Sequence, residues 1–535
     1  MDNISNNLIF DNFITKNFKI SLIFLYLGMF FGIVYSINLL GYSLDSNTLF
    51  APNMRSLHIS LMLYGFVPVM LSYLPFLLIN KEVGSSKEGI YYLNLYTIFW
   101  NIFLVFMINS LLFGNTRGLA FYDFPYELNF ILAFAGLFYI IALYKFIKLY
   151  KVTPLWIKVC LRLVIIAPIA LIILMNPIIG QVEKTVSGPH GDNTLGMSLA
   201  LIPIYYLIIK LLSQNEFKAR WNIFWIIPLI GYTSSVIHRS FIGALSYEQE
   251  WFFQYLTLLY IPLLYRWYKD ADIEKYAKLA LLISIAAFLF VDIEGNILFI
   301  PEIRWLFHRN DLIVAHAHVA MGIGVFFMVI CMYVKYIKEL RKSTLYYFYL
   351  AGIISIFLVL SISGFTQAGF NTAKTENMWL LRTIFGVVTF ASIIAFINLS
   401  VLNIKTLSNY SNLQKYNFIG FLSDGLGGLF LILFGQIIYN FLGFYFDEKY
   451  IYIIFYFVTT TGLLHLFAFI FTKHEKILTQ LTALIRVFVS SVFFALFMSK
   501  ALGFEALLIC VVDIAFATTY FILFHRKDLL CKDYR

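Results

Sequence analysis

The chain has 535 residues, of which 61% are hydrophobic and 13% are charged, with a formal net charge of +10. A soluble domain usually has about a quarter of its residues charged, so this composition excludes a soluble globular protein. The four cysteines form neither a C-x-x-C pair nor a C-x-x-C-H motif, which excludes a disulfide framework, a thiolate metal site and a covalently attached c-type haem.

Apolar segments recur along the whole chain, and most are about twenty residues long, enough to cross a bilayer core of about 30 Å. We therefore expect an all-α polytopic membrane protein. The first seventeen residues lack the layout of a cleavable signal, so the first apolar segment is expected to stay as a membrane helix. We predict sixteen spans, at residues 18–42, 57–80, 90–113, 127–150, 157–180, 192–213, 221–245, 250–268, 276–300, 312–336, 344–368, 378–403, 416–443, 450–472, 478–499 and 503–525.

Basic residues alternate between the two sides of this predicted topology. The connections after even-numbered spans are rich in Lys and Arg, for example Lys145, Lys148 and Lys151, whereas each odd-numbered connection holds at most two. Because basic residues near helix ends mark the cytoplasmic side, we expect both termini to be cytoplasmic in a bacterial inner membrane. This asymmetry explains the net charge, so the expected surroundings are lipid and not nucleic acid.

Histidines gather on one side of the same topology. Ionisable groups in a bilayer are costly and usually functional, and imidazole is a common ligand of metals and haem iron. Six of the nine histidines fall in the outer third of the membrane: His58, His190, His238, His308, His316 and His318.

The pair in the segment "NDLIVAHAHVAMG" is two residues apart. On an α-helix, His316 and His318 therefore point about 200° apart. One helix can then hold an iron atom on each flank. The alternative interpretation is two polar side chains satisfied by neighbouring helices.

Several stretches in the first 400 residues resemble the motifs of one family. They are "RSLHISLMLYGF" (55–66), "IEGNILFIPEIRWLFHRNDLIVAHAH" (293–318), "SGFTQAG" (363–369) and "MWLLRTIFGVV" (378–388), in this order. Together they resemble the catalytic subunit I of the haem–copper oxidase superfamily, closest to the branch of C-type oxidases and nitric oxide reductases. The resemblance implies a twelve-helix core over residues 1–410.

The resemblance also implies ligands for two haems. His58 and His318 would clamp a low-spin haem b, and His316 would be the proximal ligand of a high-spin haem b. Arg382 is a candidate partner of the haem propionates, and the alternative is an arginine that reaches to the outer headgroups. Glu294 would lie near the distal pocket, where family members use a Glu in proton delivery or as a ligand of the second metal.

The copper site of the oxidases is incomplete in this chain. "HGDNTLG" (190–196) has Asp192 where the family has a histidine, with His190 two residues upstream, and "IGYTSSVIHRSF" (230–241) keeps one of two adjacent histidines, His238. Copper favours imidazole, whereas carboxylate oxygens suit harder ions. A set of Asp192 and His238, with Glu294 or His190, therefore indicates non-haem iron, as in nitric oxide reductases, with copper as the alternative.

Other residues have weaker expected roles. Tyr232 lies near the position of a redox-active tyrosine in C-type oxidases, and chance is the alternative among 36 tyrosines. Glu248 and Glu250 are expected in a solvated outer loop. The inner halves of spans one to twelve contain few carboxylates, which favours an enzyme that does not pump protons. Four additional helices over 411–535 contain Asp424, His465, Arg486 and Asp513, for which filling the bundle is the default interpretation.

The sequence therefore predicts a membrane respiratory terminal reductase that reduces a diatomic gas, with nitric oxide reduction to nitrous oxide favoured over cytochrome c oxidase-type reduction of O2 to water. Electrons would come from a cytochrome c subunit or from quinol. One alternative is an inactive haem-binding paralogue or sensor that keeps His58 and His318. Another is a transporter with midplane polar groups, against which the clustering of histidines at the outer side argues.

Overall fold

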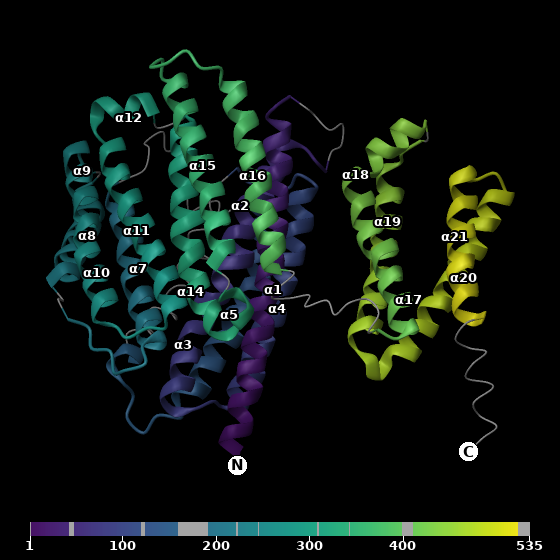
Figure 1. Ribbon diagram of the computed structural model, residues 1–535, viewed down its shortest axis with the longest axis horizontal. Coiled ribbons are helices and arrows are strands. Elements are labelled where there is room, and N and C mark those ends of the chain that lie inside the picture. Colours follow the sequence, from purple (N-terminus) through teal and green to yellow (C-terminus); the bar gives the residue numbers. More distant parts are fainter. Residues whose placement is uncertain are drawn as a thin grey trace. The chain divides into compact units, whose positions relative to one another are not determined.

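The computed structural model describes residues 2–41, 48–118, 123–158, 191–220, 223–243, 245–307, 310–341, 343–397, 410–443 and 445–522. These residues form helices and connections without a strand (Figure 1). Eleven helices in the described part are long and apolar enough to cross a membrane. The expectation of an all-α polytopic membrane protein is confirmed.

The count of sixteen spans stays a prediction. The expected span at 157–180 falls almost entirely outside the described residues. Three further apolar helices, Leu201–Leu212, Ile223–His238 and Ala506–Tyr520, are shorter than a usual span. The expected span at 250–268 is two helices joined by a 3-10 turn.

The chain divides into two compact units. The first unit comprises Met1–Ser43 and Phe50–Asn403, and the second comprises Leu44–Leu49 and Ile404–Arg535. The described helices of the first unit are α1 (Asp2–Asn38), α2 (Ala51–Ser60), η1 (Leu61–Phe66), α3 (Val67–Val83), α4 (Lys87–Leu112), η2 (Tyr126–Leu128), α5 (Asn129–Ile147), α7 (Gly191–Leu212), α8 (Ile223–Phe241), α9 (Tyr247–Leu256), η3 (Thr257–Leu259), α10 (Tyr260–Asp270), α11 (Lys275–Leu298), α12 (Pro301–Phe307), α13 (Asp311–Ala317), η4 (His318–Val325), α14 (Phe326–Tyr336), η5 (Lys338–Arg341), α15 (Ser343–Gln367) and α16 (Thr375–Ile397).

The second unit is a smaller set of helices joined by short connections. Its described elements are α17 (Asn412–Gly420), η8 (Phe421–Leu426), α18 (Gly427–Leu442), α19 (Glu448–Ile470), η9 (Thr472–His474), α20 (Glu475–Met498) and α21 (Phe504–Tyr520). Local sequence sets their ends. Ser411 and Gln414 form a capping box that starts α17, and Gly443, at φ +72°, ends α18 in the left-handed conformation.

The helix that contains the histidine pair is central to the first unit. It is continuous through α13, η4 and α14, and all nine residues Phe326–Val334 of α14 are buried. A helix that is apolar on every side belongs in the centre of a bundle. The start of this helix is less enclosed, because Val314 is 42% exposed.

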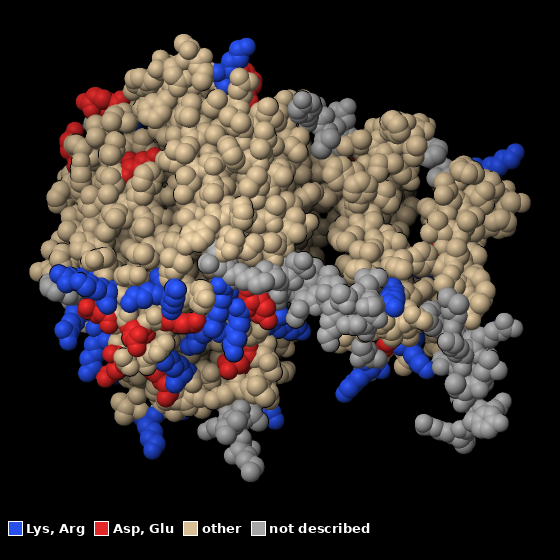
Figure 2. Space-filling model, viewed as in Figure 1, with Lys and Arg blue, Asp and Glu red and all other residues tan. Residues whose placement is uncertain are grey.

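Basic residues of the first unit gather at one end, which we call the basic end (Figure 2). The residues include Lys81, Lys145, Lys210, Lys269 and Lys335, near the ends of α3, α5, α7, α10 and α14. The helices that start with α2 and α13 therefore begin at the opposite end.

Three π-helical turns interrupt the described spans. They are η1, which follows His58 closely, η4, which begins at His318, and η8, which contains Asp424. Such turns widen the helix locally and are frequent at functional sites. Two of them lie at or near His58 and His318, which the sequence predicts as haem ligands.

Glycines permit very close helix packing in the second unit. A Cβ atom added to Gly462 of α19 would lie 1.9 Å from the backbone nitrogen of Gly425 in η8. We therefore expect Gly462→Ala to destabilise the protein by about 1–3 kcal/mol through overpacking, measured as a lower Tm of the full chain in detergent.

Gly427→Ala is the matched control, because its added Cβ would lie 3.7 Å from the backbone oxygen of Leu422, an ordinary contact. Alanine also favours a helix by about 1 kcal/mol over glycine, so this variant should keep or raise the Tm. Equal Tm values for the two variants would contradict the close packing.

Candidate functional site

The ring of His58 is held against α1. Its Nδ1 atom lies 2.8 Å from the carbonyl oxygen of Gly28, and a Cβ added to Gly32 would lie only 2.6 Å from the same Nδ1. A carbonyl oxygen can only accept, so Nδ1 is the protonated nitrogen and donates. The Nε2 atom therefore keeps its lone pair, on the edge of the ring that faces away from α1.

The ring of His318 is fixed by its own helix. Its Nδ1 atom donates to the carbonyl oxygen of Val314, one turn earlier, at 2.7 Å. By the same reasoning its Nε2 atom is the one with the free lone pair. His318 is also close enough to His58 and Arg382 for electrostatic interaction. This flank of the helix therefore faces α2 and α16.

The ring of His316 is held by α11 on the other flank. Its Nδ1 atom lies 3.1 Å from Oε2 of Glu294, and a Cβ added to Gly295 would lie 3.4 Å from its Cε1. The adjacent Glu-Gly pair thus supplies a hydrogen-bond partner and room for the ring. A carboxylate that binds one nitrogen of an imidazole orients the ring and makes the other nitrogen a stronger ligand.

These contacts confirm that the two imidazoles face opposite flanks of one helix, as the two-residue spacing predicts. In the described part of the chain, the Nε2 atoms of His58, His316 and His318 make no hydrogen bond with protein. Each of these three residues, and Glu294 as well, lies near one end of its helix, on the side of the unit opposite the basic end. Along the helix axis, the distance from each residue to that helix end is at most about 10 Å. The structure therefore places three anchored imidazoles in one layer of the bundle.

Asp311 fixes the start of the histidine helix. Its carboxylate accepts hydrogen bonds from Ser363 Oγ (2.6 Å) and Gln367 Nε2 (3.0 Å) of α15 and from Trp379 Nε1 (2.7 Å) of α16. A Cβ added to Gly364 would lie 2.6 Å from the nitrogen of Leu312. The stretches 363–369 and 378–388 thus hold the helix that contains His316 and His318. Sequence analysis missed Asp311, although an acidic residue in the first helical turn of an apolar span was a usable signal.

Arg382 faces the interior of the unit. Its Nε and Nη2 atoms donate to Ser36 Oγ (3.0 Å) and Ser36 O (3.4 Å) of α1, and its guanidinium lies 6.0 Å from the centre of the Trp379 ring. One turn further along α16, a Cβ added to Gly386 would meet no atom within 4 Å. There is therefore a positive charge beside open space on the flank that His58 and His318 face. The guanidinium is bound to α1, and the choice between a propionate partner and an arginine that reaches to headgroups stays a prediction.

The expected ligands of the second metal fall partly outside the described residues, so this site stays a prediction. His190 lies outside them, as does His308, and Asp192 lies in the first turn of α7, where its side chain is not described. His238 donates from Nδ1 to Gly243 O at 3.2 Å, on α8, which also contains Tyr232. Among the described residues, no three His, Cys, Asp or Glu side chains form a group able to hold a metal ion.

Glu294 contacts the histidine helix. Its Oε2 atom lies 3.1 Å from Nδ1 of His316, the nitrogen on the far side of the ring from Nε2, and among the described residues no hydrogen bond joins it to His238. The expected place of Glu294 beside the pocket of the high-spin haem stays a prediction. Its contact with His316 was not predicted, because a motif does not show which face of α11 packs against the histidine helix.

A buried polar chain adjoins His316 and was missed by sequence analysis. Asp292 of α11 accepts a hydrogen bond from the hydroxyl of Tyr260 and interacts electrostatically with His316. Nearby, Tyr205 and Ser284 are 2.6 Å apart through their hydroxyls, and Ser284 Oγ lies 2.5 Å from the carbonyl oxygen of Gly324. Asp292 precedes Glu294 by two residues in an apolar span, which was a usable signal.

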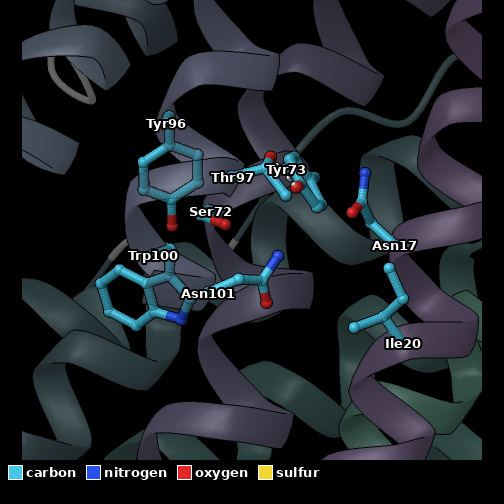
Figure 3. Close-up of a pocket in the computed structure, with 8 residues that line it drawn as sticks. All are labelled: Asn17, Ile20, Ser72, Tyr73, Tyr96, Thr97, Trp100 and Asn101. Atoms are coloured by element: carbon cyan, nitrogen blue, oxygen red, sulfur yellow. Dashed lines mark hydrogen bonds between the residues drawn. The ribbon is translucent and has the colours of Figure 1, made fainter. Parts of the chain in front are cut away.

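A small cavity lies elsewhere in the first unit (Figure 3). Its volume is about 10 Å³, which is roughly the space for one water molecule. Asn17 of α1 is part of its lining. It lies fifteen residues before Gly32, against which the ring of His58 packs, so the cavity is about 20 Å along α1 from that ring. The full lining is Asn17, Ile20, Ser72, Tyr73, Tyr96, Thr97, Trp100 and Asn101. This cavity is too small for a haem.

Comparisons with known proteins identify no family. No protein-family model matches the sequence, and no curated protein matches it. The chemistry of this site is therefore argued from its own residues.

Loss of the Asp311 carboxylate should loosen the histidine helix. Asp311→Ala leaves three side-chain donors without their acceptor, and a buried group without a partner costs roughly 1–3 kcal/mol. We expect a clear fall in Tm for the purified full chain.

The control is Glu376→Ala, which removes an exposed carboxylate from the first turn of α16. Surface substitutions usually change stability by less than about 0.5 kcal/mol. If both variants melted at the wild-type temperature, Asp311 would not anchor the helix.

Proposed function

We propose that the protein is the catalytic subunit of a membrane respiratory reductase that holds two b-type haems on opposite flanks of one helix and reduces a diatomic gas. The observation that supports this most strongly is the shared state of His58, His316 and His318. Each has its Nδ1 atom fixed by an oxygen, which leaves Nε2 as a preoriented ligand.

The residues fit haem iron by the chemistry of their donors. His58 and His318 face one another across one flank and would hold a low-spin haem b, while Arg382 and the space beside Gly386 would accept its propionate edge. His316 would hold a high-spin haem b on the other flank. When bound, the haems supply one-electron transfer and, at the second iron, an open position for a gas.

The remaining residues of the site position ligands and supply protons. Glu294 keeps the ring of His316 in one orientation by accepting from its Nδ1 atom. Asp292 and Tyr260 form a hydrogen-bonded pair next to that ring and can hold a proton close to the site of reduction. Reduction of two NO molecules to N2O takes up two protons and two electrons, so such groups are needed beside the gas.

Nitric oxide is the favoured substrate because the histidine set for copper is incomplete. The proposed second metal is non-haem iron, with Asp192, His238 and His190 as its candidate ligands. Since the described residues do not assemble this site, no step of the reaction is assigned to it. Reduction of O2 is the second candidate, with Tyr232 as its possible redox partner, and the electron donor in both cases is a cytochrome c subunit or quinol.

The proposed location is the bacterial inner membrane, with both termini cytoplasmic and the haem site toward the periplasm. This follows from the positive-inside rule. The basic end of the first unit holds the Lys and Arg residues, and the three histidines lie toward its other end.

Substitution of the histidines tests the haem assignment directly. We expect His58→Ala and His318→Ala to lose the low-spin haem signal, and His316→Ala to keep it while losing the high-spin haem and NO turnover. The reduced-minus-oxidised absorption spectrum of the purified protein distinguishes these results. His474→Ala changes an exposed histidine of η9 and should leave both signals intact.

A spectrum that none of the three site substitutions changes would refute the proposal. Loss of both haems in every site variant, with an unaltered Tm, would contradict the separate assignment of the two flanks.

Glu294→Gln tests the part assigned to the carboxylate. The amide oxygen can still accept from Nδ1 of His316 but has no negative charge, so the ring becomes a weaker donor to iron. We expect a lower iron–histidine stretching frequency in resonance Raman spectra, an unchanged low-spin haem, and activity reduced roughly 10- to 100-fold.

Two other outcomes assign Glu294 differently. An unchanged iron–histidine frequency together with loss of the non-haem metal would place Glu294 among the metal ligands. Unchanged frequency, metal content and activity would remove it from the site.

A further inference from the structure

The second unit buries an arginine between two carboxylates. Arg486 of α20, which is 2% exposed, donates from Nη1 to Asp513 of α21 at 2.5 Å and from Nη2 to Asp424 of η8. Salt bridges of this kind inside an apolar bundle are expensive to form and usually functional. Nothing in the proposed gas reduction uses them.

The charges of this cluster do not balance. One guanidinium and two carboxylates sum to a net charge of −1 when both carboxylates are ionised. The neighbouring His465 does not correct this, because its Nδ1 donates to Oδ1 of Asn417 at 2.9 Å and its Nε2 lies 3.5 Å from Nη2 of Arg486. A lone pair that faces an arginine belongs to a neutral imidazole. The cluster therefore lacks one positive charge.

A proton supplies this charge better than a metal cation does. The guanidinium already occupies one oxygen of each carboxylate and would repel a second fixed cation at that distance. The other oxygen of either carboxylate can accept a proton without displacing Arg486. In addition, Nε of Arg486 is a buried donor with no partner among the described residues, which indicates a place for an acceptor such as water.

Polar groups lead from the start of α20 to the cluster. Asn417 Nδ2 donates to Thr479 Oγ1 at 2.8 Å, so Thr479, Asn417, His465 and Arg486 follow one another through side-chain contacts. Glu475, the first residue of α20, has a buried Oε1 atom that no described residue contacts through a hydrogen bond. Along α20 the distance from Glu475 to Arg486 is about 16 Å.

The buried face of α20 combines small hydroxyl side chains with one arginine. Thr479, Thr482, Arg486 and Ser490 are all at most 2% exposed. The three hydroxyls donate to backbone carbonyl oxygens, and small residues of this kind are common where membrane helices pack together. Bundle filling therefore explains the hydroxyls but not Arg486, because a buried charge is costly.

Backbone features make room for the same groups. A Cβ added to Gly420 would lie 2.6 Å from the ring of His465, and the π-turn η8 contains Asp424. Tyr416 of α17 packs against the His465 ring at 5.7 Å between centres, and Tyr520 of α21 lies next to Tyr416. The titratable groups beside the cluster are therefore His465, Tyr416 and Tyr520.

We propose that the second unit contains a proton-binding site in which Asp424 and Asp513 share one proton beside Arg486, loaded from the start of α20 along the polar face formed by Thr479, Asn417 and His465. Loading converts one carboxylate to a carboxylic acid and involves no electron. The proposal is independent of haem or gas chemistry.

Infrared spectroscopy of the full chain in nanodiscs tests the shared proton. At neutral pH the wild-type protein should show the C=O stretch of a buried protonated carboxyl group, which shifts in D2O. Asp424→Asn and Asp513→Asn should each abolish this band, because Arg486 is then balanced by the one remaining carboxylate. Asp447→Asn, at the cap of α19, should leave it unchanged.

The route is tested by the rate at which the same band exchanges in D2O. Thr479→Val and His465→Phe should slow the exchange several-fold relative to the wild type, and Thr460→Val, on an exposed face of α19, should not.

A wild-type protein without the protonated band, or a band that survives both Asp substitutions, would overturn the proposal. A band that sodium ions abolish would also overturn it, since the missing charge would then be a metal cation. Unchanged exchange rates in Thr479→Val and His465→Phe would refute the route.

Discussion

The hydrogen bond at Nδ1 of each site histidine is the interaction on which the proposed chemistry depends. It fixes the tautomer, so that the lone pair is on Nε2, and it fixes the ring, so that this lone pair points in one direction. Each of the three rings obtains this bond differently: His58 from a carbonyl oxygen of α1, His318 from its own helix and His316 from Glu294. A side chain that only satisfied its polarity in a membrane would not need the same nitrogen bound in all three cases.

The central helix turns these local bonds into a two-sided arrangement. Its α14 part is buried on every side, and its start is tied to α15 and α16 through Asp311. The helix is therefore held at both ends, and the two imidazoles on its flanks cannot turn toward the same side. In the second unit a polar side chain is likewise held by contacts from neighbouring helices. Two carboxylates fix Arg486, and together the three groups have one uncompensated negative charge when both carboxylates are ionised.

The sequence was sufficient for features that depend on one helix or on composition. The period of an α-helix predicts opposite directions for His316 and His318, and apolar segments predict a polytopic all-α protein; the structure shows both. The sequence did not predict contacts between helices that are far apart in the chain. The ring of His58 packs against Gly32, 26 residues away, and Arg486 pairs with Asp424, 62 residues away. Spacing along the chain does not specify which helix faces meet, so the contact between Glu294 and Nδ1 of His316 was not predicted.

The content of haem, iron and copper per polypeptide in the purified native protein tests the central claim most directly. The account predicts two b-type haems per chain, one of them with two axial histidines, and a third iron atom without copper. A protein that contains no haem, or only one, when expressed with full cofactor supply would contradict the two-flank arrangement. One copper per two haems would keep that arrangement and contradict nitric oxide as the favoured substrate.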